Sequence, residues 1–189
     1  MSPESNLELV LLAASVAGKA HGTQTRKGSP EPYINHPLRV AHETAQAGLP
    51  PEAIAAALLH DVVEDTSWTL EDLASRFPAR VVHLVDLLTK WWPDDAPKTL
   101  KASEKPKYYG AILKDPDAMA IKLIDRADNL QDMVRMLPRM RSWAERYLSK
   151  TESEIRPIFE ACPNPRARQQ YDQALRDLHR ALGHRPHQP

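Results

Sequence analysis

The sequence contains a single cysteine and no excess of charge of either sign. One cysteine, Cys162, excludes an internal disulfide, and we interpret it as an ordinary thiol rather than a nucleophile. Lys and Arg together number 25, and Asp and Glu together number 25. The chain therefore lacks the positive excess that is typical of nucleic-acid-binding proteins, and we expect no nucleic acid partner.

Long apolar runs are also missing. No run approaches the roughly 20 residues that a membrane-spanning helix needs, so we expect no membrane association. The first residues, Met1-Ser2-Pro3-Glu4-Ser5, are acidic and lack the basic segment of a signal peptide, which predicts a cytoplasmic protein. No segment alternates between apolar and polar residues, so we expect no sheet.

Helical periodicity runs through most of the chain. Its 189 residues are ample for one core, and we expect an all-α domain over residues 1–183 with a disordered tail over residues 184–189. The helices are expected at about residues 7–17, 37–46, 51–61, 70–77, 78–88, 106–114, 116–136, 138–161 and 165–182. The segment 91–106 combines Trp, Pro, Asp and Lys without a period, which predicts a surface loop or lid.

The most informative stretch is Leu58-Leu59-His60-Asp61-Val62-Val63-Glu64-Asp65-Thr66, at the end of an apolar run that starts at Ala53. Burying such charges without partners costs on the order of several kcal/mol, and a metal ion would compensate because imidazole and carboxylate are both metal ligands. On a helix, His60 shares a face with Glu64, and Asp61 shares one with Asp65. By itself, the stretch is equally well interpreted as satisfied polar residues near a helix end.

Two distant segments favour the metal. Glu31-Pro32-Tyr33-Ile34-Asn35-His36-Pro37 lies before the cluster, and Ile121-Lys122-Leu123-Ile124-Asp125-Arg126-Ala127-Asp128-Asn129 lies well after it. Together the three segments supply two imidazoles and two carboxylates. That ligand set suits a divalent transition ion with open positions for water and substrate.

The order and spacing of these segments resemble the HD superfamily of metal-dependent phosphohydrolases over about residues 13–132, and within it the hydrolase domain of the RelA/SpoT type. The resemblance implies an HD-domain helical bundle with a mononuclear metal site. The implied ligands are His36, His60, Asp61 and Asp125, and the implied ion is Mn²⁺ or another divalent transition metal. The resemblance also implies catalytic roles for Glu64 and Asp65, whose carboxylates can orient a metal-bound water and move its protons.

Further residues resemble the substrate-binding positions of the family. Arg26-Lys27 matches a basic pair that faces the substrate phosphates, although a solvated surface pair is an equally good interpretation. Asn129 lies one helical turn after Asp125 and is expected to contact the ribose or base. The sequence departs from the bifunctional enzymes at Asp128, where they have His, and at Asp132, where they have Thr. Asp132 favours the stand-alone small alarmone hydrolases.

The resemblance implies hydrolysis of the 3′-diphosphate of guanosine tetra- and pentaphosphate alarmones, giving GDP or GTP and pyrophosphate. The long bifunctional enzymes carry a synthetase domain after the hydrolase domain, and this sequence ends where that domain would begin, so we expect hydrolysis alone. The alternatives are a phosphatase acting on another nucleotide, for example an NADPH 2′-phosphatase or a nucleotidase, and a non-catalytic alarmone-binding module. A nucleotide is the expected partner, and a homo-oligomer is left open.

Overall fold

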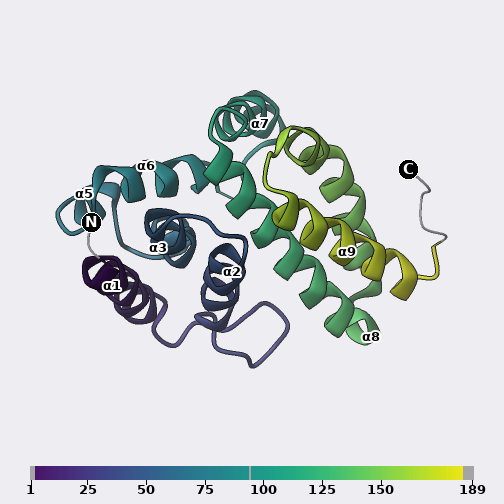
Figure 1. Cartoon of the computed structure of the whole chain (residues 1–189). Coiled ribbons are helices and arrows are strands. Elements are labelled where there is room, and N and C mark those ends of the chain that lie inside the picture. The colour runs from purple at the N-terminus through teal and green to yellow at the C-terminus, as the bar shows by residue number, and fades with distance from the viewer. Residues whose placement is uncertain (1–2, 94, 185–189) are drawn as a thin grey trace.

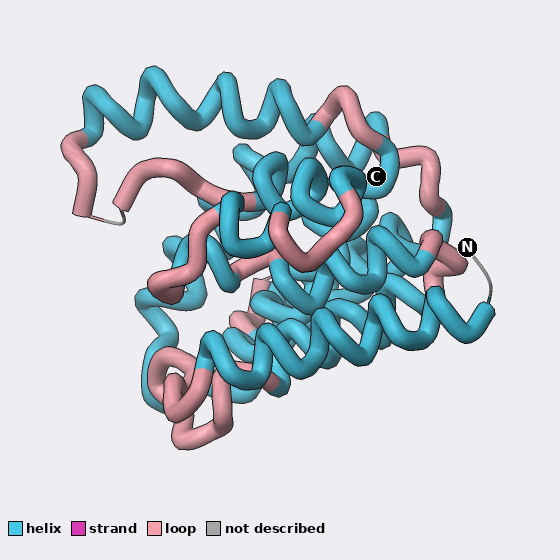
Figure 2. The backbone as a smooth tube through the Cα atoms, turned by 90° about the vertical axis from the view of Figure 1, so that its left-hand side faces the viewer, coloured by secondary structure: helices cyan, strands magenta, loops and turns pink. Residues whose placement is uncertain are grey.

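The chain folds almost entirely into helices, as Figure 1 and Figure 2 show. The computed structural model describes residues 3–93 and 95–184. These residues form nine helices: α1 (Pro3–His21), α2 (Asn35–Gln46), α3 (Pro51–Leu59), α4 (Val62–Asp65), α5 (Leu70–Ala74), α6 (Ala79–Leu88), α7 (Lys98–Ile112), α8 (Pro116–Ala161) and α9 (Pro165–Ala181). No strand occurs among them, so the expected all-α fold is confirmed.

Helix α3 lies at the centre of the N-terminal half, in contact with α1, α2 and α6 (Figure 1). It starts with Pro51 in its first turn, where the missing N–H costs no hydrogen bond. Four small side chains and two leucines are fully or almost fully buried along it: Ala53, Ala55, Ala56, Ala57, Leu58 and Leu59. Because alanine keeps neighbouring backbones close, the three surrounding helices can approach α3 and the polar residues that follow it.

Helix α8 is a hairpin of two helical segments rather than one rod. Met140 has non-helical angles, with φ −138° and ψ 33°, and the chain changes direction there. Arg126 consequently donates a hydrogen bond of 3.1 Å to the hydroxyl of Thr151, a residue that a straight helix would carry far away. The sequence predicted two helices with a break at about residue 137, and the break lies three residues further on.

The connection between α1 and α2 is held against this turn of α8. Gly28 has a positive φ of 76°, and a Cβ built on it would lie 2.9 Å from the sulfur of Met140 and 3.2 Å from that of Met136. A larger residue would therefore be strained in both backbone and packing. This close approach fixes the position of Arg26 and Lys27, which precede the glycine.

Two predicted element boundaries are wrong. The predicted loop over residues 91–106 ends early, because α7 already begins at Lys98 and includes Pro106. Within α7, where every residue is described, Ile112 is the only buried one, so the helix has no apolar stripe that a sequence pattern could reveal. The helix expected to reach Asp61 ends at Leu59, and the chain resumes helical structure at Val62.

Among the described residues, no helix combines the length and the apolar character needed to cross a bilayer. Of the predicted disordered tail, His184 is described and exposed, while residues 185–189 lie outside the described part. The tail, like the extent of a single domain, stays a prediction.

The central position of α3 makes Leu59 a sharp test of the packing. The Leu59 side chain is 0% exposed, so Leu59→Ala should lower the free energy of unfolding by about 2–5 kcal/mol through lost contacts and a residual cavity. Leu11→Ala is the matched control, because Leu11 is 59% exposed and its loss should change stability by less than about 0.5 kcal/mol. Urea denaturation measures both, and equal effects would contradict this packing.

Candidate metal centre

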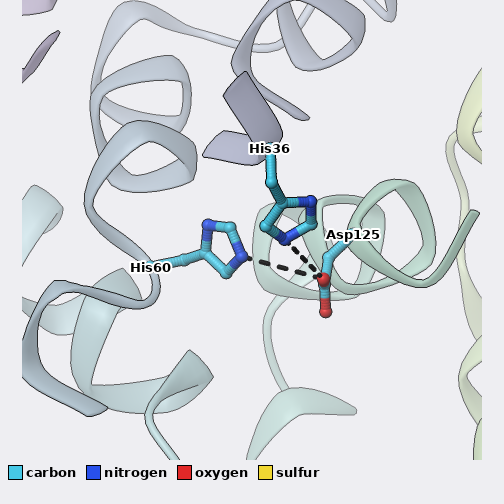
Figure 3. Close-up of side chains that lie close together, drawn as sticks. All are labelled: His36, His60 and Asp125. Atoms are coloured by element: carbon cyan, nitrogen blue, oxygen red, sulfur yellow. Dashed lines mark ion pairs between the residues drawn. The ribbon is translucent and has the colours of Figure 1, made fainter. Parts of the chain in front are cut away.

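Three side chains from separate elements converge in the interior. His36 comes from the first turn of α2, His60 follows the end of α3, and Asp125 lies on α8 (Figure 3). All three are buried, and one ligand atom of each lies within 4.8 Å of the others. The Oδ1 atom of Asp125 is 3.3 Å from Nε2 of His36 and 3.7 Å from Nε2 of His60.

The fourth predicted ligand lies beside the same two rings. The Oδ2 atom of Asp61 is 3.6 Å from Nε2 of His36 and 3.3 Å from Nε2 of His60, and it accepts a hydrogen bond of 2.7 Å from the hydroxyl of Tyr33. Ligand atoms about 2.1 Å from a common ion at tetrahedral or octahedral angles are roughly 3.0–3.4 Å apart. The observed separations are close to those that a shared cation requires.

The backbone selects which nitrogen of His60 faces the cluster. Its Nδ1 lies 2.7 Å from the carbonyl oxygen of Ala57, one helical turn earlier, and so carries the proton and donates. Nε2 is therefore the nitrogen that faces Asp61 and Asp125, and it is buried and has no hydrogen-bond partner among the described residues. A buried ring nitrogen without such a partner is unfavourable unless a ligand satisfies it, and a metal ion, which takes the place of a proton on Nε2, would do so.

His36 is oriented by a carboxylate behind it. Its Nδ1 donates to Oδ2 of Asp128 at 2.7 Å, which leaves Nε2 towards Asp61 and Asp125. The guanidinium of Arg39 in turn donates to Asp128 at 2.6 and 3.0 Å. Such carboxylate–imidazole pairs fix the tautomer and raise the basicity of a metal-binding histidine.

The orienting roles of Asp128 and Arg39 were missed by the sequence reasoning. Asp128 follows Asp125 by three residues, which places it on the next turn of α8, and Arg39 follows His36 by three residues on α2. These spacings were visible in the sequence, but the pairing of α2 with α8 was not.

The carboxylates of the cluster are held in their charged form. Burial alone would raise the pKa of Asp125, but Lys122 and the two histidines hold it well below its usual range. The ammonium of Lys122 is 2.9 Å from Oδ2 of Asp125. Burial would likewise lower the pKa of His60, yet the charges of Asp61 and Asp125 raise it to about 9. Concentrated negative charge of this kind attracts a cation.

The two predicted catalytic carboxylates lie at the edge of the cluster. Glu64 accepts hydrogen bonds from the backbone N–H of Lys90 at 2.9 Å and pairs with its ammonium at 2.6 Å. Asp65 accepts from the hydroxyl of Tyr33 at 2.9 Å. Burial raises the pKa of both carboxyls, and the neighbouring charge of Asp61 raises them further. Groups with raised pKa values are better proton acceptors near neutral pH.

The predicted substrate-binding residues Arg26, Lys27 and Asn129 also lie beside the metal cluster. The guanidinium of Arg26 donates to Asp132 at 3.0 and 2.9 Å and to Oδ1 of Asn129 at 2.6 Å. Asn129 donates in turn to Oδ1 of Asp125 at 2.6 Å. Lys27 lies over the ring of Trp143, with 5.2 Å between its ammonium and the ring centroid. The charge of Arg26 is thus largely matched by Asp132, whereas Lys27 has an aromatic partner.

Most of these groups line one cavity of about 400 Å³, among them the metal-cluster residues His36, Asp61 and Asp125. Its basic lining residues come from the loop before α2, from residue 90 and from α7 and α8: Arg26, Lys27, Lys90, Lys101, Lys105, Lys122, Arg126 and Lys150. Its acidic lining residues are Asp61, Glu64, Asp65, Asp125 and Glu154, and its rings include those of Tyr33, Trp143 and Tyr147. Basic groups outnumber acidic ones, so the cavity suits an anionic ligand with a ring that can stack.

The chain resembles known proteins over the part that carries this site. A model of the HD domain family matches residues 13–149. The chain is 41% identical over 136 residues to a probable GTP pyrophosphokinase of Mycobacterium leprae, and 41% identical over 126 residues to a guanosine-3′,5′-bis(diphosphate) 3′-pyrophosphohydrolase of Aquifex aeolicus. The matches cover 72% and 67% of this chain but only 17% and 18% of those relatives.

One solved structure has a similar fold over nearly its whole length. It is described as a metazoan ortholog of SpoT that hydrolyzes ppGpp, and it matches with a TM-score of 0.72. The match covers 92% of this chain and 96% of the other, at 24% sequence identity. At this identity, the likeness concerns the fold.

The role of Asp128 can be tested without removing a ligand. Asp128→Asn keeps the shape of the side chain but removes the charge opposite Nδ1 of His36, so the affinity for Mn²⁺ should fall about 10- to 100-fold. Asp172→Asn, the same change at the surface of α9, should leave the affinity unchanged. Competition with a fluorescent chelator measures both, and unchanged affinity in Asp128→Asn would show that Asp128 does not support the metal.

Proposed function

This chain belongs to the HD domain family, and from that premise we propose that it hydrolyses the 3′-diphosphate of guanosine tetra- and pentaphosphate, giving GDP or GTP and pyrophosphate. The observation that carries the proposal is the buried cluster of two imidazoles and two carboxylates at the base of a predominantly basic cavity. The names of curated relatives such as the Aquifex aeolicus pyrophosphohydrolase support the same substrate class.

Members of the HD domain family depend on a divalent metal, and we propose Mn²⁺ for this chain. His36, His60, Asp61 and Asp125 would hold it. A metal bound there would supply a water of lowered pKa and polarise the phosphoryl group. The buried and unpartnered Nε2 atom of His60 supports this assignment, because a metal would satisfy it.

Glu64 and Asp65 would manage the protons. A carboxylate at the cavity wall accepts the proton of the attacking water, and the proton is then delivered to the 3′-oxygen that leaves. Lys90 holds Glu64 through both its backbone N–H and its ammonium, and Tyr33 holds Asp65 through its hydroxyl. These contacts restrict each carboxylate to one orientation, which favours reaction.

The remaining lining would bind the nucleotide. Lys27, Lys105 and Lys150 would face the phosphates, where their charge offsets the negative charge that develops in the transition state. Arg26 is stacked on Tyr33 at 5.2 Å and paired with Asp132, so it would act as a planar surface more readily than as a free cation. Asn129 lies between Arg26 and the metal cluster and would contact the ribose.

Product analysis tests the substrate. Guanosine tetraphosphate incubated with the protein and Mn²⁺ should yield GDP and pyrophosphate, and a chelator should stop the reaction. Orthophosphate from NADPH, with guanosine tetraphosphate left intact, would replace the proposal with a phosphatase acting on another nucleotide. Tight alarmone binding without any product would indicate a binding module instead. The cytoplasmic location and the oligomeric state stay predictions.

A single substitution separates metal binding from proton transfer. Glu64→Gln keeps the length of the side chain but removes its basicity, so kcat should fall about 10²- to 10⁴-fold while Mn²⁺ stays bound. Glu160→Gln is the control, because Glu160 is exposed on α8, outside the cavity lining, and its carboxylate pairs with Arg156. Steady-state kinetics with a parallel metal titration gives both values. An undiminished kcat in Glu64→Gln would remove Glu64 from the mechanism.

A further inference from the structure

A second and larger cavity lies behind the metal centre. It measures about 690 Å³ and is bounded by α2, α8 and the first half of α9. None of the residues that line it also lines the metal cavity. Its volume is within the range of small-molecule binding sites, about 300–1,000 Å³.

The two cavities use opposite faces of α8. Asp125, Arg126 and Asn129 face the metal cavity, whereas Ile124, Ala127, Asp128 and Gln131 face the second one. Since successive helical residues are rotated by about 100°, these sets occupy different sides of the same stretch of about two turns. The helix is therefore a shared wall, and a molecule in the second cavity would lie outside the metal site.

The lining combines an apolar floor with carboxamides. Val40, Ile124 and Ala127 are 0%, 2% and 4% exposed and form the floor. Five carboxamide side chains stand around it, namely Asn35, Gln131, Gln169, Gln170 and Gln173. Carboxamides present a donor and an acceptor side by side, the arrangement that pairs with the edge of a nucleobase.

The charges of this cavity are already matched within the protein. Arg39 is paired with Glu31 and Asp128, and Arg166 lies 3.7 Å from Glu43. No lysine lines the cavity, in contrast to the metal cavity with its six lysines. A phosphate would find no uncompensated cation here, so the chemistry favours an uncharged ligand.

One polar atom of the lining is buried without a partner. The side-chain amide of Gln170 donates to Glu43, but its Oε1 has no hydrogen-bond partner among the described residues. A buried acceptor of this kind is unfavourable until a donor reaches it. The exocyclic amino group or the ring N–H of a purine is such a donor.

We propose that the cavity between α2, α8 and α9 is a second binding site that takes an uncharged purine nucleoside, with the base on the apolar floor and its edge on the carboxamides. The proposal stands on this cavity alone and does not depend on what the metal centre hydrolyses. Its position makes the site regulatory, because Asp128 and Arg39 belong to its lining and also orient His36. A nucleoside that shifts either side chain would change the orientation of the His36 ring, which is expected to bind the metal.

Titration of guanosine and adenosine in separate experiments, followed by calorimetry on the full chain, tests the site. One of the two should bind with saturation at about one molecule per chain, and binding should persist in excess chelator, since the metal cavity is not involved. Gln170→Leu should weaken it about tenfold or more by removing the carboxamide. Gln46→Leu is the matched control, because Gln46 is exposed on α2 outside the cavity, and it should bind like the wild type.

Several results would overturn the proposal. One is the absence of saturable binding by either nucleoside up to about 10 mM, which corresponds to an affinity too weak for a built site. Another is binding that needs the metal, or that Gln170→Leu leaves unchanged although thermal unfolding shows that the variant is folded. For the regulatory part, saturating nucleoside should change the affinity for Mn²⁺, and Mn²⁺ should change the nucleoside affinity by the same factor. Two independent affinities would contradict the coupling.

Discussion

The structure depends on a buried cluster of charge in the middle of a helical fold. Asp61 and Asp125 bring negative charge to a place that is closed to most solvent, and the Nε2 atoms of His36 and His60 face them. Such an arrangement is stable only if counter-charges surround it or a cation enters. Lys122 supplies part of the compensation from α8, and the remaining space between the four side chains is suited to an ion.

This requirement explains how the surrounding helices are packed. The alanines of α3 are buried on several sides, so α1, α2 and α6 approach it closely and bring His60 within reach of α2 and α8. The hairpin of α8 then brings Trp143, Tyr147 and Lys150 back over the cavity that Asp125 opens into. The apolar core and the polar site are thus parts of one arrangement, because the same helix contacts bury the first and assemble the second.

Helix α8 separates the metal cavity from the larger cavity between α2, α8 and α9. Its turns around residue 126 present carboxylate, guanidinium and amide groups to the metal cavity and present Asp128 to the larger cavity behind it. Asp128 is the link, since its two oxygens accept from His36 and from Arg39. A change on either face of this helix is transmitted over one side chain rather than through a long path, which makes any coupling direct.

The sequence by itself determined the helical class, because helical periodicity is local. Its three separated motifs also predicted four metal ligands, through the family that they resemble. The family that these motifs resemble is confirmed by the match over residues 13–149. The first part of α7, from Lys98 to about residue 105, was predicted as a loop because it buries little and has no apolar period, whereas its end was expected as a helix. Only the tertiary structure decided that Asp128 orients His36 and that Asp132 forms an ion pair with Arg26. It also decided that basic residues from α7 and from the part of α8 after Met140 line the cavity. The first two contacts join residues 92 and 106 positions apart, and the path of the chain, not its local pattern, brings them together.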